Sequence, residues 1–288
     1  MKRYKGLITA VVVVGLMGGP GTVAEAASPQ PGGRLLYVEF ATTTLVPGQL
    51  KSAQPDGNGG QDLGKSLPWY AGPDYSPDGT KFVYAEGMSL RIADADGGND
   101  EWFVAGPSGP SFPRWSPDGR WIATEAGGIH AWRTDRSEYS NLATAFENIA
   151  MAWAPGGKRF ATVTNDGEVR IYRVGNQEPV KRFAVAEPRQ VDWSPDGKTL
   201  AVQAQGDIVL ITVSTGVIRR VTSTPEVYES SPVWSPDGGW IAYGSGAAGY
   251  DEYGNPHTVA PVIHLMTRTG TDQHPTSIAG IPTSWRSY

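Results

Sequence analysis

The sequence contains no cysteine among its 288 residues. Disulfides, thiolate metal sites and cysteine nucleophiles are therefore excluded. A chain of this length can bury a core large enough to be stable without covalent cross-links. Histidine is also scarce, and the four histidines show no H-x-H or H-x-x-x-H spacing. We predict no metal site and no cofactor, and we assign no catalytic residue.

Long segments free of glycine and proline are rare, because the chain holds 37 glycines and 23 prolines. Few stretches could therefore form a helix with an apolar stripe. Short runs rich in Val, Ile, Tyr and Phe, bounded by turn residues, are typical of strands. The composition predicts an all-β protein.

The longest apolar run, Leu7–Met17, has eleven residues and follows three basic residues. It is too short to span a membrane, which takes about 20 residues. The small-x-small sequence Ala24-Glu25-Ala26 follows it. This arrangement predicts a secretory signal peptide over residues 1–27 and a single domain over residues 28–288. We expect a secreted or periplasmic, soluble protein without a membrane span after cleavage.

Positive charge is also lacking, since the formal net charge is −5 and becomes −7 when residues 1–26 are removed. A nucleic-acid partner needs a basic surface that neutralises phosphates. The charge therefore disfavours nucleic acid, and we expect a monomer that binds a protein or a glycan.

One motif is abundant. It reads YSPDGTKFVYA at 75–85, WSPDGRWIATE at 115–125, WSPDGKTLAVQ at 193–203 and VWSPDGGWIAYGS at 233–245, with a degraded copy, WAPGGKRFATV, at 153–163. The aromatic residues that begin the copies are 40, 38, 40 and 41 residues apart. A period of roughly 40–45 residues with strands and turns predicts propeller blades of four strands each.

The two ends of the repeat region complement each other. Residues 34–41 and 49–64 resemble a blade without its first strand, whereas Ile281–Trp285 resembles a first strand without its blade. We therefore predict a six-bladed β-propeller that is closed by strand exchange between the N- and C-terminal segments, which leaves no free sheet edge.

The Ser-Pro-Asp-Gly segment predicts a turn rather than an active site. Serine, proline, aspartate and glycine each suit one position of a type I turn followed by a residue with positive φ. Repetition in several blades also favours architecture over chemistry. We assign this structural role to Asp78, Asp118, Asp196, Asp237, Gly79, Gly119, Gly197 and Gly238.

With these motifs the chain resembles the TolB-type family of six-bladed propellers and its WD-like relatives. The resemblance rests on the repeated (W/Y)SPDG, on third strands that end in D-G or T-G turns, and on fourth strands such as IRRVT at 218–222. It covers nearly all of residues 34–288, and it implies the propeller domain only. It specifies fold much better than function.

One spacing departs from the period, because Trp285 follows Trp234 by 51 residues. The excess lies in Gly244–Ala260, which we predict to be a lengthened loop between second and third strands. Long loops with aromatic and charged residues often carry function, although they are also tolerated as insertions. Together with the divergent connectors on the same face, it gives a predicted partner-binding set: Tyr70, Arg114, Arg189, Tyr228, Glu229, Tyr250, Asp251, Glu252 and Tyr253.

The sequence offers two catalytic or metal-binding alternatives. The tract Asp94–Asp100 resembles part of a calcium loop, but it lacks the final glutamate and falls at a hairpin position. A channel-centred hydrolase or lyase acting on a carbohydrate or a lactone would need paired acids, which we expect only at Asp251-Glu252. We therefore favour a binding module, and leave enzymatic activity as the alternative.

Overall fold

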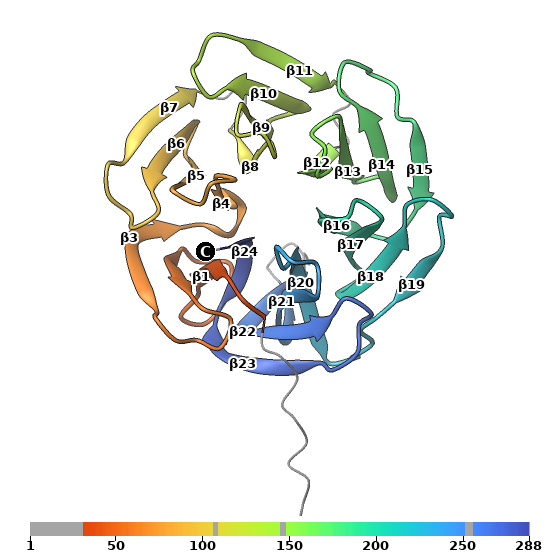
Figure 1. Cartoon of the computed structure of the whole chain (residues 1–288). Coiled ribbons are helices and arrows are strands. Elements are labelled where there is room, and N and C mark those ends of the chain that lie inside the picture. Colours follow the sequence, from red (N-terminus) through yellow and green to blue (C-terminus); the bar gives the residue numbers. More distant parts are fainter. Residues whose placement is uncertain (1–30, 106–108, 145–147, 251–255, 288) are drawn as a thin grey trace, which may run out of the picture. The chain divides into compact units, whose positions relative to one another are not determined.

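The computed structural model describes residues 31–105, 109–144, 148–250 and 256–287. The predicted signal peptide lies outside the described residues. The segment from Pro31 onward forms one compact unit in which four-stranded antiparallel sheets surround a central axis (Figure 1). No helix among the described residues is both long and apolar enough to cross a membrane.

The six sheets are numbered here as blades in chain order, and each is given from its innermost strand outward. Blade 1 contains β24 (Ile281–Arg286), β1 (Arg34–Glu39), β2 (Gly48–Ala53) and β3 (Gln61–Leu67). Blade 2 contains β4 (Asp74–Tyr75), β5 (Lys81–Glu86), β6 (Ser89–Asp94) and β7 (Glu101–Ala105). Blade 3 contains β8 (Ser111–Trp115), β9 (Trp121–Glu125), β10 (Ile129–Arg133) and β11 (Tyr139–Ala143).

The second half of the ring follows the same order. Blade 4 contains β12 (Asn148–Trp153), β13 (Arg159–Thr164), β14 (Glu168–Arg173) and β15 (Lys181–Ala184). Blade 5 contains β16 (Pro188–Trp193), β17 (Thr199–Ala204), β18 (Asp207–Thr212) and β19 (Ile218–Arg220). Blade 6 contains β20 (Val227–Trp234), β21 (Trp240–Tyr250), β22 (Pro256–Thr267) and β23 (His274–Ala279). A short 3₁₀ helix, η1 (Trp69–Ala71), joins blades 1 and 2.

The core is divided among the contacts between blades. Side chains alternate across a strand, so both faces of a blade can be apolar. In β1, Leu36 and Val38 pack toward blade 2, whereas Leu35 and Tyr37 pack toward blade 6. Among the described residues the buried apolar side chains form six such clusters, one for each pair of neighbouring blades. Each blade therefore depends on both neighbours.

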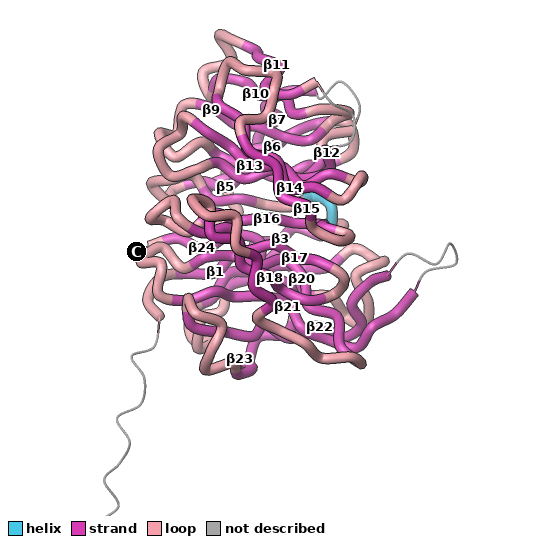
Figure 2. The backbone as a smooth tube through the Cα atoms, turned by 90° about the vertical axis from the view of Figure 1, so that its right-hand side faces the viewer, coloured by secondary structure: helices cyan, strands magenta, loops and turns pink. Residues whose placement is uncertain are grey.

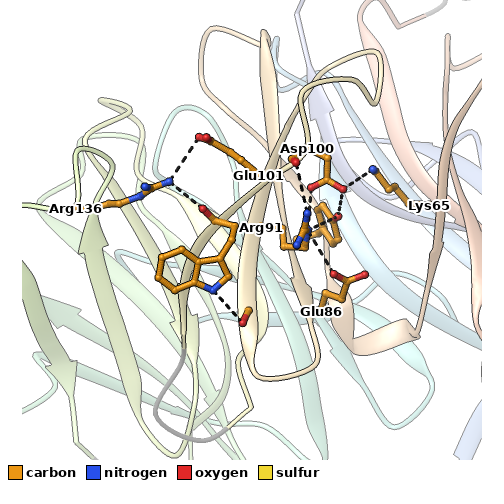
Figure 3. Close-up of polar contacts among 9 residues, drawn as sticks. Lys65, Glu86, Arg91, Asp100, Glu101 and Arg136 are labelled. Atoms are coloured by element: carbon orange, nitrogen blue, oxygen red, sulfur yellow. Dashed lines mark hydrogen bonds and ion pairs between the residues drawn. The ribbon is translucent and has the colours of Figure 1, made fainter.

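Polar contacts join the outer strands of neighbouring blades. Asp100, just before β7, accepts a hydrogen bond from Lys65 of blade 1 (2.5 Å) and lies beside Arg91 of β6 (2.9 Å) (Figure 3). On the other side of blade 2, the Arg136 guanidinium donates to the carbonyl of Trp102 (2.9 Å). Asp94 instead accepts from Lys81 and Asn99. The acidic side chains of the tract Asp94–Asp100 thus bind separate partners instead of converging as calcium ligands would.

The first and last strands share one sheet. β24 pairs antiparallel with β1, with Trp285 opposite Leu35. Trp285 is 8% exposed and its Nε1 donates to the carbonyl of Gly32 (3.0 Å). The Arg286 guanidinium lies 4.3 Å from the centre of the Tyr75 ring in blade 2. β24 therefore links blade 1 to blade 2 as well as pairing with β1.

The Ser-Pro-Asp-Gly segments adopt one turn geometry. In the last copy along the chain, the Gly238 N–H donates to the Ser235 carbonyl (2.9 Å), and Gly238 has a φ of 69°. Asp237 Oδ1 accepts from the Ser235 hydroxyl (2.5 Å) and from Gly239 N–H (2.9 Å). These hydrogen bonds lower the pKa of Asp237. The same contacts recur at Asp78, Asp118 and Asp196.

The degraded copy shows which part of the motif the turn needs. Gly157 N–H donates to Ala154 C=O (2.8 Å) and Gly157 has a φ of 66°, although this copy has neither the serine nor the aspartate. A glycine with positive φ is therefore common to all five copies. How much each aspartate contributes to stability stays a prediction.

The turn leads to an expectation for two substitutions. Asp237→Asn keeps an Oδ1 acceptor for both hydrogen bonds, so it should change the free energy of unfolding by less than about 0.5 kcal/mol. Gly238→Val should cost about 1–3 kcal/mol or more, because a β-branched residue resists positive φ. Its Cβ would also lie 3.4 Å from Cδ of Pro195. Urea denaturation of both variants tests this, and equal losses would contradict it.

The position of β24 leads to an expectation for truncation. Removing the chain from Ile281 onward exposes the edge of β1 and takes Ile281 and Trp285 out of two core clusters. Loss of one buried tryptophan costs about 3–5 kcal/mol, so Tm should fall by about 10 °C or more. Removal of Ser287 and Tyr288 alone is the control. An unchanged Tm in the longer truncation would show that β24 is dispensable.

Candidate functional site

The innermost strands carry a ring of six side chains around the axis. Each stands immediately before the aromatic residue that starts a motif copy, or before Trp285. In blade order from blade 1 they are Ser284, Asp74, Arg114, Ala152, Asp192 and Val233. All six line one cavity of about 410 Å³. Two acids and one arginine therefore lie together in the channel, although the repeat places them in three different blades.

A second cavity, also of about 410 Å³, opens at the opposite end of the channel. We call it the channel mouth. It contains no residue of the Ser-Pro-Asp-Gly turns, whereas the first cavity contains Ser76, Pro77 and Pro236. Both cavities are lined by Arg114, Gln190 and Ser231. They are therefore two ends of one channel, with Arg114 between them.

Backbone irregularities place the side chains of the mouth. The pairing register of β8 shifts between Ser111 and Arg114, and Phe112 has a φ of 49°. Equivalent shifts occur in β16 and in β20, where Ser231 has a φ of 54°. β-Bulges of this kind turn side chains out of the regular alternation and are frequent near functional sites. Here the bulges lie in the inner strands, between the channel mouth and the aromatic residues that begin the motif copies.

The two channel acids bind across blades. Asp74 accepts from the backbone N–H of Trp115 in blade 3 (2.8 Å) and from the Ser284 hydroxyl in blade 1 (2.7 Å). Asp192 accepts from the N–H groups of Trp193 (2.9 Å) and of Trp234 in blade 6 (2.8 Å). Each acid thus accepts a hydrogen bond from a backbone N–H of the next blade, Trp115 or Trp234, that is not used in strand pairing.

Burial governs the ionisation of these acids. Desolvation raises the pKa of Asp192 to about 7. The backbone hydrogen bonds and the charge of Arg114 favour the ionised form, but their effect on the pKa is smaller than that of desolvation. The nearby charge of Asp74 raises it further. Desolvation also raises the pKa of Asp74. Asp74 and Asp192 are therefore an acidic pair that the sequence analysis missed when it expected paired acids only at Asp251-Glu252.

The structure brings three of the predicted partner-binding residues together. Arg114, Arg189 and Tyr228 all line the channel mouth. Tyr70 in η1 and Tyr250 at the end of β21 are exposed, at 41% and 70%, but do not line the cavity. Asp251, Glu252 and Tyr253 lie outside the described residues. Their role in binding stays a prediction.

Glu229 differs from the rest of the predicted set. It is only 3% exposed, and its carboxylate accepts from the Thr224 hydroxyl (2.6 Å). Burial raises its pKa. The reason is that β20 begins at Val227, so Glu229 lies within a strand and not in a surface connector. Arg114 and Arg189 also lie within strands, β8 and β16, near the ends that face the mouth.

The predicted long loop at Gly244–Ala260 is largely a β-hairpin. β21 runs to Tyr250 and β22 starts at Pro256, so the extra residues extend the two strands. Figure 2 shows this hairpin projecting from the ring on the same side as η1. Thr43, between β1 and β2, bridges to Val259 of the hairpin. His257 and Thr258 bring the base of the hairpin into the wall of the mouth.

Several residues of the mouth were not predicted. Gln203 donates to the Tyr228 hydroxyl (3.2 Å), and His257 has a buried Nδ1 without a hydrogen-bond partner. Gln203 ends the motif copy at 193–203 and His257 lies in the segment Gly244–Ala260, but neither the copy nor the segment showed that these two side chains face the channel. Within the described part of the chain, no three His, Cys, Asp or Glu side chains are grouped as a metal ion would require.

The pKa of Asp192 leads to a prediction about pH. Between the ordinary aspartate pKa, about 4, and about 7, the folded protein binds more protons at Asp192 than the unfolded chain does. The stability supplied by this group therefore falls as pH rises through that window. Asp192→Asn removes the effect, so its Tm relative to wild type should rise from about pH 5 to about pH 8.

Two comparisons control this measurement. His264 has a lowered pKa and acts with the opposite sign, but it is present in both proteins and cancels in the difference. Val217→Ala, at a side chain that is 60% exposed and carries no titratable group, should show a constant difference from wild type. A constant difference for Asp192→Asn as well would show that Asp192 has no raised pKa.

Solved structures share the architecture. TolB from Acinetobacter baumannii superposes with a TM-score of 0.67 at 19% identity, covering 89% of this chain and 67% of that one. A putative TolB from Agrobacterium tumefaciens gives a TM-score of 0.66 at 15% identity, covering 89% and 94%. Hydrazine synthase of Kuenenia stuttgartiensis gives 0.55 at 19% identity, covering 72% and 66%. At these identities the likeness establishes the fold.

Sequence comparison adds one relative and one family profile. An uncharacterized peptidase of Bacillus subtilis, YuxL, is 25% identical over an alignment of 205 residues, and the match covers 65% of this chain and 31% of that protein. The chain thus spans less than a third of this relative's length. The family profile described as the TolB beta propeller domain matches residues 84–279, well over half of the chain. The protein belongs to the TolB β-propeller domain family.

Proposed function

We propose that the propeller is an exported binding module that takes a polypeptide segment of a partner protein in its channel mouth. The observation that carries this proposal is the channel mouth itself. Its cavity of about 410 Å³ is within the usual range for ligand sites, roughly 300–1,000 Å³. It combines apolar walls with a few polar groups, and it lies on the face opposite the repeated turns.

Exposed apolar side chains surround the mouth. Leu45 and Trp69 line its edge and are 49% and 51% exposed. Trp69 packs against Phe112, which lies deeper in the cavity, with 5.5 Å between the ring centres. Exposed apolar groups gathered at a cavity favour recognition of a partner, and tryptophan and arginine most often anchor such contacts.

A polypeptide is favoured over a glycan as the ligand. The B. subtilis relative that is 25% identical over 205 aligned residues is named an uncharacterized peptidase, and peptides are the substrates of that class of enzyme. Residues 1–27 support export, since they have the pattern of a signal peptide. An exported partner protein would meet the propeller in the same compartment.

A hydrolase that uses Asp74 and Asp192 is the second candidate. The raised pKa of Asp192, about 7, suits a general acid or base, and the relative's name favours hydrolysis. The contacts favour a structural role instead. Both oxygens of each carboxylate accept hydrogen bonds from backbone N–H groups or Ser284. We therefore rank binding first.

The mouth can be tested by site-specific cross-linking. A photoreactive amino acid in place of Trp69 should cross-link the partner in intact cells, because position 69 borders the cavity. The same amino acid in place of Arg120, whose side chain is 70% exposed on the turn face, should not. Trp69→Ala should then weaken the purified complex by about 2 kcal/mol, roughly 30-fold.

Lys198→Ala is the matched control for affinity, since Lys198 is exposed on the turn face. It should leave binding unchanged, and circular dichroism should show all variants folded. Cross-links obtained only from position 120 would place the binding surface on the wrong face and refute the proposal.

A further inference from the structure

The channel mouth is positively charged in a protein whose net charge is negative. Arg114 and Arg189 line it, and none of the described residues that line it is an aspartate or a glutamate. Glu187 is close to Arg189 in the chain and its charge also acts on Tyr228, but Glu187 is exposed and does not line the cavity. Because the chain as a whole carries a net charge of −5, this concentration of positive charge selects for an anionic ligand.

Arg114 is held in a fixed position with part of its guanidinium unused. Its Nη1 donates to the carbonyls of Gly72 (2.9 Å) and Pro113 (3.0 Å). Its Nε and Nη2 make no hydrogen bond with the described residues, and the side chain forms no ion pair among them. Asp74 and Asp192 act on it through space only. A guanidinium edge of this kind matches the two oxygens of a carboxylate.

Arg189 supplies a second cation without a protein partner. It is exposed at the start of β16, and it makes no ion pair or hydrogen bond with the described residues. Burial raises the pKa of Tyr228, and the charge of Arg189 partly offsets that rise. Arg189 and Arg114 therefore line the same cavity from blades 5 and 3, on different sides of the axis.

Apolar walls accompany these cations. Phe40, Trp69, Phe112, Ile149 and Ile281 line the same cavity. A ligand that matches this lining presents an anionic group next to an apolar group. Inorganic anions and highly hydrated acidic sugars lack that apolar part, whereas a peptide can place an apolar side chain beside a carboxylate.

Two carboxyl groups lie at the far end of the channel. Asp74 and Asp192 line the cavity on the turn side of Arg114 but not the mouth. A carboxylate that enters from the mouth meets Arg114 first and then two acids. Attraction to Arg114 therefore favours binding at this depth, and the two acids oppose deeper entry once they are ionised.

We propose that the channel mouth recognises a peptide through one carboxylate, which binds between Arg114 and Arg189, and through an adjacent apolar side chain, which packs on the Trp69 and Phe112 wall. This inference rests on the proposed function, and it adds the chemistry that the mouth selects. The carboxylate belongs either to the free C-terminus of the partner or to an aspartate or glutamate beside an apolar residue.

Three synthetic peptides test the proposal by isothermal titration with the full chain after signal removal. They are acetyl-Ala-Ala-Phe with a free carboxylate, the same peptide as its C-terminal amide, and acetyl-Ala-Asp-Phe amide. The free acid should bind at least about tenfold more tightly than its amide, because charge-assisted hydrogen bonds are lost in the amide. Binding of the acid should weaken as salt is added.

Variants assign the effect to the arginines. Arg189→Ala should weaken the free acid about tenfold and leave the amide unchanged, because only the acid uses the charge. Arg114→Gln should do the same, and a melting curve verifies its fold, since Arg114 also binds two backbone carbonyls. Lys198→Ala removes an equal charge from the turn face and should have no effect. Comparable binding of the aspartate amide would identify a side chain as the source of the carboxylate.

Two results would overturn the inference. One is equal binding of acid and amide in wild type and in both arginine variants. The other is the absence of binding by either carboxylate peptide. In both cases the proposed function is judged separately, because cross-linking from position 69 reports on a partner in the mouth whatever its charge.

Discussion

Every blade of this protein is apolar on both faces, and that constraint governs the rest of the structure. A sheet such as the one containing β1 buries Leu35 and Tyr37 on one side and Leu36 and Val38 on the other. It therefore needs two neighbours, and the ring as a whole needs its first and last blades to meet. The pairing of β24 with β1 brings the C-terminal strand into the first blade, in a chain without cysteine that has no disulfide to hold its ends.

The same constraint explains why the channel acids are present. Inner strands of neighbouring blades diverge around the axis and do not pair with one another, so the backbone N–H groups that face the channel need other acceptors. Asp74 and Asp192 supply them for Trp115 and Trp234 of the following blades. The resulting acids are desolvated, and the pKa of Asp192 rises to about 7. A structural requirement for acceptors thus places two carboxyl groups at the turn end of the channel.

The sequence predicted the features that repeat. The period near 40 gave the blades, and the Ser-Pro-Asp-Gly copies gave turns whose hydrogen bonds are seen at Asp237 and its equivalents. Features that depend on contacts between blades were harder to predict. Asp74 and Asp192 each stand immediately before the aromatic residue of a motif copy. They come near each other only because the ring of blades brings their inner strands around one channel. The hairpin at Gly244–Ala260 was expected as a loop, because glycine-rich composition does not reveal that two strands continue outward in register.

The two ends of the channel show how one repeat can hold a structural and a variable surface. At the turn end, a glycine with positive φ is needed in each of the five copies, so substitution there is restricted by the fold. At the mouth, the bulged ends of β8, β16 and β20 carry Arg114, Arg189 and Tyr228, and no repeat-wide geometry dictates these side chains. Selection for a ligand can therefore change the mouth blade by blade without disturbing the contacts that close the ring. Recognition is for this reason expected at the bulged ends of the inner strands, where the fold constrains the backbone but leaves the side chains free to vary.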